Sequence, residues 1–156
     1  LVLMYSSGLR LGEVCALRYE DIDRKQMRIH IQRSKNRSSR FAILSKYALD
    51  LLTSYWFQCG TPKGWLFPAN SKKNASNKFV RYRKLFQWNE RLTCHSFRHA
   101  FGTHLYESGT DLLTIKELLG HKSLLSTTVY IHLASNGVQS ALSPFDQFGG
   151  ELIGRQ

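Results

Sequence analysis

The spacing of apolar residues along the chain changes between two periods, and each period predicts one type of element. Apolar residues three or four positions apart predict helices over residues 1–5, 9–17, 46–58, 75–88, 94–107, 112–119 and 127–133. Residues 27–32 alternate strictly between apolar and polar, which predicts a half-buried strand. Its inward side chains are Met27, Ile29 and Ile31. Residues 41–44 are apolar again after a polar, basic stretch, so we expect a β-hairpin with Lys35 near its turn.

Three of these helices carry residues that commonly begin or end a helix. Ser45, Thr93 and Asp111 each precede a helix, where a side-chain oxygen can accept hydrogen bonds from free backbone N–H groups. Gly120 stands where the helix that follows Asp111 should end. The helices that Thr93 and Asp111 begin are joined by a short turn and resemble a helix-turn-helix in outline. A purely DNA-binding interpretation therefore stays open.

Two predicted helices have an apolar side and a polar side. The side of helix 46–58 that we expect in the core is made of Ala48, Leu51, Leu52 and Tyr55. The inward side of helix 75–88 is made of Phe79, Tyr82, Leu85 and Phe86. Its outward side carries Lys78, Arg81 and Lys84. These three cations would suit contacts to DNA phosphates, although a solvated basic face is the ordinary explanation.

The balance of charge favours a nucleic-acid partner. Lys and Arg number 22 against 11 Asp and Glu in 156 residues, which gives a formal net charge of +11. Three cations of the hairpin, Arg33, Arg37 and Arg40, serve either as phosphate contacts that position it or as plain solvated charges.

The length is that of about one domain, and 42% hydrophobic residues are enough to bury a sizeable core.

The number of cysteines and the hydropathy of the sequence indicate the cellular compartment in which we expect the protein. The three cysteines are odd in number and widely spaced, which argues against a disulfide framework and favours a reducing compartment. No metal-ligand spacing is present, so we expect no metal. The sequence shows no signal peptide and no apolar run long enough to span a bilayer, and we expect a cytoplasmic protein. It begins without Met inside a helical pattern, so we expect a fragment of a longer polypeptide.

The segment 95–130 gathers the side chains that phosphoryl transfer through a tyrosine would need. It contains His-Ser-Phe-Arg-His, then Leu-Gly-His, then Thr-Thr-Val-Tyr. A phenol can act as the nucleophile, cationic side chains can donate to phosphate oxygens, and histidine can move a proton. Arg10 precedes them at the start of helix 9–17, where Glu13 could hold its guanidinium. Taken alone, those two residues would be an ordinary surface pair.

The order and setting of six residues resemble the tyrosine recombinases, the phage integrase family. The six are Arg10 (in Ser-Gly-Leu-Arg-Leu-Gly-Glu), Lys35, His95, Arg98, His121 and Tyr130. The family's pattern is His-x-Leu-Arg-His, Leu-Gly-His and Thr-Thr-x-x-Tyr, with the tyrosine nine residues after the histidine, as here. Phe97 stands where Leu is usual, and Ser126 replaces the first Thr. The similarity covers residues 6–132, including Asp-Ile-Asp before the first strand and the Leu-Phe-Pro segment.

The resemblance implies a mainly α fold with a small antiparallel β-sheet (α+β) that cleaves and rejoins DNA without metal or cofactor. Tyr130 would attack a backbone phosphate to give a 3′-phosphotyrosyl link and a free 5′-hydroxyl. The remaining roles fall to five residues. Arg10 and Arg98 would bind the nonbridging oxygens, His121 would add a hydrogen bond, His95 would accept or orient a proton, and Lys35 would protonate the leaving oxygen.

The resemblance also implies how the polypeptide is organised. Residues 1–133 would form the catalytic domain, without the N-terminal DNA-clamping domain that members usually carry, and residues 134–156 a tail that could dock on another protomer. Double-stranded DNA would be the partner, bound by a tetramer, although the fragment could be monomeric without DNA. Two alternatives remain open: a DNA-binding fragment without activity, and a type IB topoisomerase.

Overall fold

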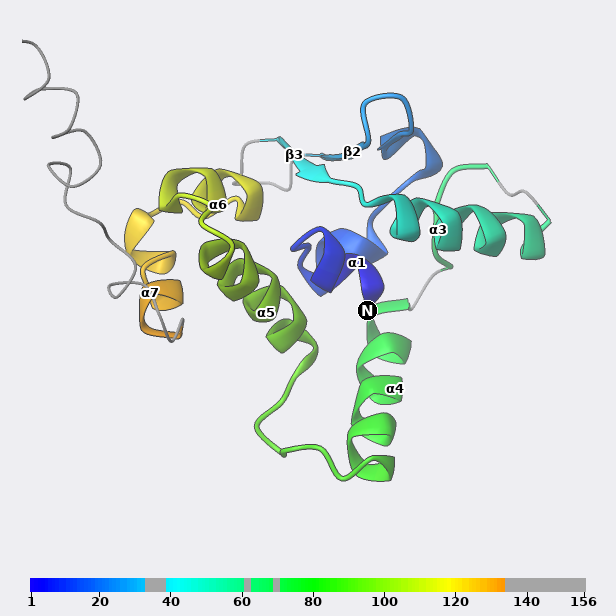
Figure 1. The fold of residues 1–156 in the computed structure, drawn as a ribbon. Coiled ribbons are helices and arrows are strands. Elements are labelled where there is room, and N and C mark those ends of the chain that lie inside the picture. The colour runs from blue at the N-terminus through cyan, green and yellow to red at the C-terminus, as the bar shows by residue number, and fades with distance from the viewer. Residues whose placement is uncertain (33–38, 61–62, 69–70, 134–156) are drawn as a thin grey trace, which may run out of the picture.

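The computed structural model describes residues 1–32, 39–60, 63–68 and 71–133. Helices make up most of it, as expected, and a small antiparallel sheet completes it (Figure 1). The elements in chain order are α1 (Val2–Ser6), α2 (Leu11–Cys15), the 3₁₀ helix η1 (Tyr19–Asp21), β1 (Ile22–Asp23), β2 (Arg28–Ile31), β3 (Arg40–Ile43), α3 (Lys46–Gln58), α4 (Ser71–Leu85), α5 (Cys94–Glu107), α6 (Leu112–Leu119), the 3₁₀ helix η2 (Leu124–Ser126) and α7 (Val129–Leu133).

Capping explains why three helices begin where the sequence predicted. The Ser45 hydroxyl accepts a hydrogen bond from the Ala48 N–H (3.2 Å), and the Thr93 hydroxyl accepts one from the His95 N–H (3.2 Å). Asp111 accepts from two N–H groups of the first turn of α6. The predicted bounds of α3, α5 and α6 are therefore confirmed at both ends.

The sheet has the order β1-β2-β3, with each pair antiparallel. The hairpin of β2 and β3 is confirmed, and Ile31 pairs with Arg40 where the two strands enter the connecting segment. The strand expected over 27–32 is one residue shorter at each end. At its start, Met27 has a left-handed backbone (φ 50°), which keeps this residue out of the extended run. The two-residue strand β1 was not predicted, and it pairs Ile22 with Ile29.

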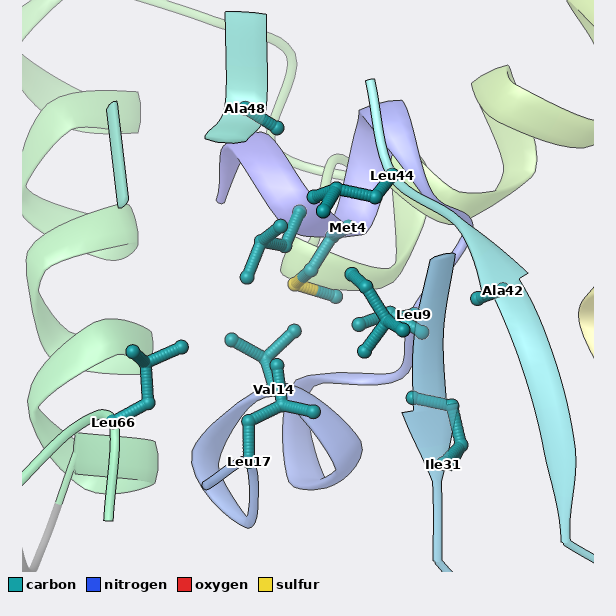
Figure 2. Packing of buried hydrophobic residues seen from close by; sticks show 11 residues of the cluster. Met4, Leu9, Val14, Leu17, Ile31, Ala42, Leu44, Ala48 and Leu66 are labelled. Carbon is teal, nitrogen blue, oxygen red and sulfur yellow. The ribbon is translucent and has the colours of Figure 1, made fainter. Parts of the chain in front are cut away.

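Two clusters of buried side chains hold the elements together. The larger one lies between α1, α2, α3 and the sheet, and Figure 2 shows Met4, Leu9 and Val14 meeting at its centre. The smaller one consists of Phe101, Ile115, Leu119 and Tyr130. It joins α5, α6 and α7, and α5 packs against α1 as well, so this helix connects the two clusters (Figure 1).

Helix α4 departs most from the prediction. It spans Ser71–Leu85 rather than 75–88, and of the four side chains expected to face inward only Phe79 is buried. Tyr82, Leu85 and Phe86 are exposed, because α4 packs mainly against α2 and its last turns extend away from the core (Figure 1). The ring of Phe86 instead stacks on its exposed neighbours Tyr82 and Trp88. On α3, Leu51 is likewise exposed, contrary to expectation.

Within the described residues, the helices are too short or too polar for any of them to cross a bilayer. The segments 33–38 and 134–156 lie outside the described residues. The predicted hairpin cations Arg33, Lys35 and Arg37 and the predicted docking tail fall in these segments.

Candidate active site

Arg10 is held at the N-terminal end of α2 by three hydrogen bonds. Its backbone N–H donates to Glu13 Oε2 and its Nη1 donates to Glu13 Oε1, both at 2.8 Å. Its Nη2 donates to the carbonyl of Gly120 (3.3 Å), which lies 110 residues further along the chain. The pairing of Arg10 with Glu13 is the one that their i,i+3 spacing predicts, and the bond to Gly120 fixes the guanidinium beside the end of α6.

Arg98 is the most deeply buried cation of the described residues, with 1% of its side chain exposed. Its Nη1 donates to the Gly8 carbonyl (2.6 Å) and its Nη2 to the Leu119 carbonyl, so it joins the α1–α2 turn to the end of α6. Its Nε is buried and has no hydrogen-bond partner among the described residues. Burial, and then the charge of Arg10, lower the pKa of Arg98 to about 10, so the group stays charged at neutral pH.

A third guanidinium completes the arrangement. Arg40, at the start of β3, donates from Nη2 to Glu13 Oε2 (3.1 Å), and Arg98 Nη1 lies 3.7 Å from the same oxygen. We call Arg10, Arg40, Arg98 and Glu13 the arginine cluster. Burial would raise the pKa of Glu13, but the hydrogen bond from the Arg10 N–H and the charge of Arg40 outweigh it and lower the pKa. The cluster contains one carboxylate and three guanidiniums, so it has two positive charges in excess. This excess favours the binding of an anion.

His121 follows the left-handed C-cap Gly120 of α6 and lies beside Tyr130. Its Nδ1 is 2.9 Å from the Thr127 hydroxyl, and its ring is nearly parallel to the ring of Tyr130 at a centroid distance of 6.2 Å. Burial, followed by the charges of Arg98 and Arg10, lowers the pKa of His121 to about 4. At neutral pH the ring is therefore a neutral imidazole rather than a cation at a helix end.

Tyr130 lies on α7 with 1% of its surface exposed and belongs to the smaller buried cluster. Its ring packs on Gly102 of α5 so closely that a Cβ there would lie 2.5 Å from Tyr130 Cζ. Burial raises the pKa of the Tyr130 phenol, while the charges of Arg98 and Arg10 act in the opposite direction. The phenol is thus inside the electrostatic field of both arginines, but it is covered.

Two histidines of α5, His95 and His99, lie against each other, and His99 also lies near the tyrosine ring. His95 is exposed in the first turn, and its ring meets that of His99 edge to face at 4.8 Å. The ring centroid of His99 lies 6.2 Å from that of Tyr130. The part of the imidazole that the protein covers loses solvation, and this loss, followed by the neighbouring His99, lowers the pKa of His95. The i,i+4 spacing of the two histidines on one helix face was the sequence signal for His99.

A cavity of about 620 Å³ opens between the β2–β3 strand ends and α6. Its cationic lining consists of Arg10, Arg40, Lys116 and Lys122, with His121 beside them. Arg98 and Tyr130 are not in the lining. Arg98 lies beside the lining residue Glu13, and the Tyr130 ring lies against the lining residue His121. Of the six predicted positions the structure thus brings together Arg10, Arg98, His121 and Tyr130, with His95 at the edge, while Lys35 lies outside the described residues.

The remaining predicted contacts to DNA divide into two groups. Lys78, Arg81 and Lys84 are exposed on α4, whereas 11% of the Arg40 side chain is exposed. In the described part of the chain, His, Cys, Asp and Glu side chains form no cluster of three that could hold a metal ion.

Comparison with known proteins identifies related sequences and folds. Residues 1–136 match the sequence profile described as the phage integrase family. The putative integrase/recombinase y4eF of Sinorhizobium fredii is 36% identical over 152 residues, which cover 94% of this chain and 60% of that protein. A tyrosine recombinase of Pseudothermotoga lettingae is 32% identical over 153 residues, covering 96% of this chain and 54% of the relative. The chain thus spans about half the length of the curated relatives it matches.

Among solved structures, the crystal structure of XerA recombinase has the same fold. The two superpose with a TM-score of 0.76 at 23% sequence identity, over 96% of this chain and 54% of the other. The mainly helical architecture with a three-stranded antiparallel sheet is therefore shared with that protein.

Proposed function

The chain belongs to the phage integrase family, and from that membership we propose that it is the catalytic domain of a site-specific DNA recombinase. It cleaves and rejoins double-stranded DNA through a 3′-phosphotyrosyl intermediate on Tyr130. The observation that carries the proposal is the joining of Arg10 and Arg98 through Glu13, next to a histidine stacked on the tyrosine.

The arginine cluster supplies the site for the scissile phosphate. Its two excess positive charges match the charge that develops on the nonbridging oxygens in the transition state. Because Arg10 is already bound to Glu13 and Gly120, its orientation is set before DNA arrives, which lowers the cost of reorganisation during the reaction. His121, neutral at pH 7, can add a hydrogen bond to the same phosphate.

The covalent step exchanges one phosphodiester bond for another. The Tyr130 oxygen forms a bond to phosphorus while the bond from phosphorus to the 5′-oxygen breaks. The phenolic proton passes to a base, for which His95 is our candidate, and Lys35 gives a proton to the leaving 5′-oxygen. Rejoining is the reverse, so no ATP is consumed.

Tyr130 must leave its position on Gly102 before it can attack, because 1% exposure gives DNA no access to the phenol. We propose that binding of DNA and assembly of a tetramer move α7, and that residues 134–156 take part as a tail that docks on a neighbouring protomer. Lys78, Arg81 and Lys84 are proposed to contact phosphates from the exposed side of α4, and Arg33 and Arg37 from the hairpin. The enzyme is expected to act on DNA in the cytoplasm.

Trapping the intermediate tests the proposal. The chain is incubated with a pool of duplexes of random sequence that each carry a nick, so that cleavage near it releases a short strand and prevents rejoining. We expect a covalent protein–DNA complex on a denaturing gel, lost in Tyr130→Phe and kept in the control Tyr47→Phe, whose tyrosine is exposed on α3. No complex from the unsubstituted chain, with salt-sensitive binding retained, would identify a DNA-binding fragment without activity.

A further inference from the structure

Arg40 lies in the arginine cluster, although its position in the sequence, on a basic hairpin, indicated a contact to DNA. It begins β3, and 11% of its side chain is exposed, against 24% for Arg10. Although Arg40 lines part of the cavity, most of its side chain lies against protein, and its contacts are to Glu13 and Gly120. The geometry of Arg40 therefore calls for another role.

The first contact of Arg40 is with the carboxylate of Glu13, which orients Arg10. Glu13 uses Oε1 for Arg10 Nη1, and its Oε2 accepts both from the Arg10 N–H and from Arg40 Nη2. With Arg40 on one side, the carboxylate plane is fixed, and so is the direction in which Arg10 presents its guanidinium.

Its second contact is with the backbone that precedes His121. A Cβ built on Gly120 would lie 2.5 Å from Arg40 Nε and 2.7 Å from its Cδ, so the Arg40 side chain packs directly on this residue. Gly120 has a left-handed backbone (φ 63°) and gives its carbonyl to Arg10 Nη2. Arg40 thus covers Gly120, the link between α6 and His121, while Arg10 holds its carbonyl.

We propose that Arg40 is a positioning residue that acts through Glu13 and Gly120 to hold Arg10 and His121 at the scissile phosphate. The inference rests on the proposed function and adds to it a residue outside the six positions. It also links the hairpin to the site, because Arg40 pairs with Ile31 where the strands enter the segment that contains Lys35.

The test separates the rate of the covalent step from the affinity for DNA. A nicked duplex recovered from the trapped pool is used to measure DNA affinity over a range of salt, and the rate of adduct formation at saturating protein. For Arg40→Met we expect about a 100-fold slower covalent step, since small misplacements of catalytic groups cost rates of this order. Because Arg40 also carries one charge of the cluster, we expect some loss of DNA affinity and of salt dependence, but a smaller one than for Arg81→Met. Arg81→Met, on the exposed face of α4, should instead weaken binding and reduce the salt slope by about 1.

Arg91→Met is the matched control for loss of an exposed arginine, and should leave both quantities unchanged. If Arg40→Met weakens binding and salt dependence as Arg81→Met does, with the rate at saturation intact, Arg40 is a phosphate contact and the inference is wrong. Should Arg40→Met fail to fold, Arg40→Lys takes its place. Lysine keeps the charge but not the two-nitrogen fork, so we expect at least about a tenfold slower step, and a wild-type rate would overturn the inference.

A second measurement does not depend on activity. Side-chain NMR signals of Arg10 and His121 in the DNA-free chain should shift in Arg40→Met and stay in place in Arg91→Met. Absence of an adduct in the unsubstituted chain would count against the proposed function, whereas unshifted Arg10 and His121 signals would count against the positioning role.

Discussion

The molecule has two basic regions, which differ in burial and in how firmly their side chains are held. In the arginine cluster, Arg10, Arg40 and Arg98 surround Glu13 and are largely buried. On α4, Lys78, Arg81 and Lys84 point into solvent. The first region has fixed directions and few ways to rearrange, whereas the second has charges on long, mobile side chains.

This difference corresponds to two tasks that the proposed function requires, binding DNA and acting on one phosphate. Exposed cations release counterions and give affinity that depends on salt but little on geometry. Buried cations act at low local dielectric, where their field is strong and their direction matters, but they must be compensated in the free protein. Glu13 and the carbonyls of Gly8, Leu119 and Gly120 provide that compensation here.

Replacement of the central carboxylate should have the largest effect on stability. Glu13→Gln leaves three guanidiniums without their shared counter-charge, so we expect a loss of about 3 kcal/mol in the free energy of unfolding, the low end for removal of one partner of a buried ion pair. Urea unfolding measures it, with Glu20→Gln as the control for an exposed ion pair. A loss as small as the control's would mean that the cluster is no better desolvated than the surface of α4.

The packing of the tyrosine tests whether the rigidity of the buried region reaches α7. Gly102→Ala places a methyl group 2.5 Å from Tyr130 Cζ, and such overpacking costs about 1–3 kcal/mol. We expect the ring to be displaced and the pKa of the Tyr130 phenol to fall towards its ordinary value, because burial is what raises it. NMR titration of isotope-labelled tyrosine follows this change. An unchanged pKa would show that the ring stays covered.

The dependence of stability on pH gives a smaller effect of known sign. The pKa of His121 is about 4 in the fold against an ordinary value of 6.5, because of burial and then of Arg98 and Arg10. The unfolded chain takes up a proton at higher pH, so the contribution of His121 is complete above about pH 6.5 and is lost as the pH falls towards 4. Unfolding at several pH values should show a shallower decline in His121→Gln. Equal declines would place the histidine in solvent.

The exposed region should show the smallest effect on stability. Replacement of Lys78, Arg81 and Lys84 by glutamine is expected to change the free energy of unfolding by no more than about 0.5 kcal/mol, as for other surface positions. The slope of binding affinity against salt should fall by about 3, because each replaced cation leaves one DNA phosphate with its counterions. An unchanged slope would show that these cations are a solvated face without contacts to DNA phosphates.

Local chemistry explains which parts of this structure could be predicted from the sequence. Helices α3, α5 and α6 begin at Ser45, Thr93 and Asp111, whose oxygens bond to N–H groups two or three residues away. The Arg10–Glu13 pair is equally local. The prediction of the inward residues of α4 was wrong for the last turns of the helix. A helical period shows which side of a helix is apolar but not how much of its length packs against other elements, and the last turns of α4 extend away from the core.

The parts of the site that the sequence did not reveal are set by interactions between distant residues. Arg40 looked like one more cation of a basic hairpin, and only the fold brings it to Glu13, 27 residues away, and to Gly120. Gly102 carried no signal within its helix, because the reason for its small size is Tyr130. The order of the residues that resemble the family's pattern could be recognised from the sequence. The carbonyl groups that accept hydrogen bonds from Arg10 and Arg98, and the contact of Arg40 with Glu13, could not.

The bonds of Arg10 and Arg98 also bear on how the protein folds. Arg10 reaches a carbonyl 110 residues along the chain, and Arg98 reaches one 90 residues back. Bonds of such sequence separation form only after the intervening chain has closed into a loop, and that closure costs conformational entropy before either bond can stabilise the fold. The turn between α1 and α2 must therefore meet the end of α6 before either guanidinium can reach its distant carbonyl acceptors. During synthesis, Arg10 therefore has to wait for the segment around Gly120 before its side chain can reach that carbonyl.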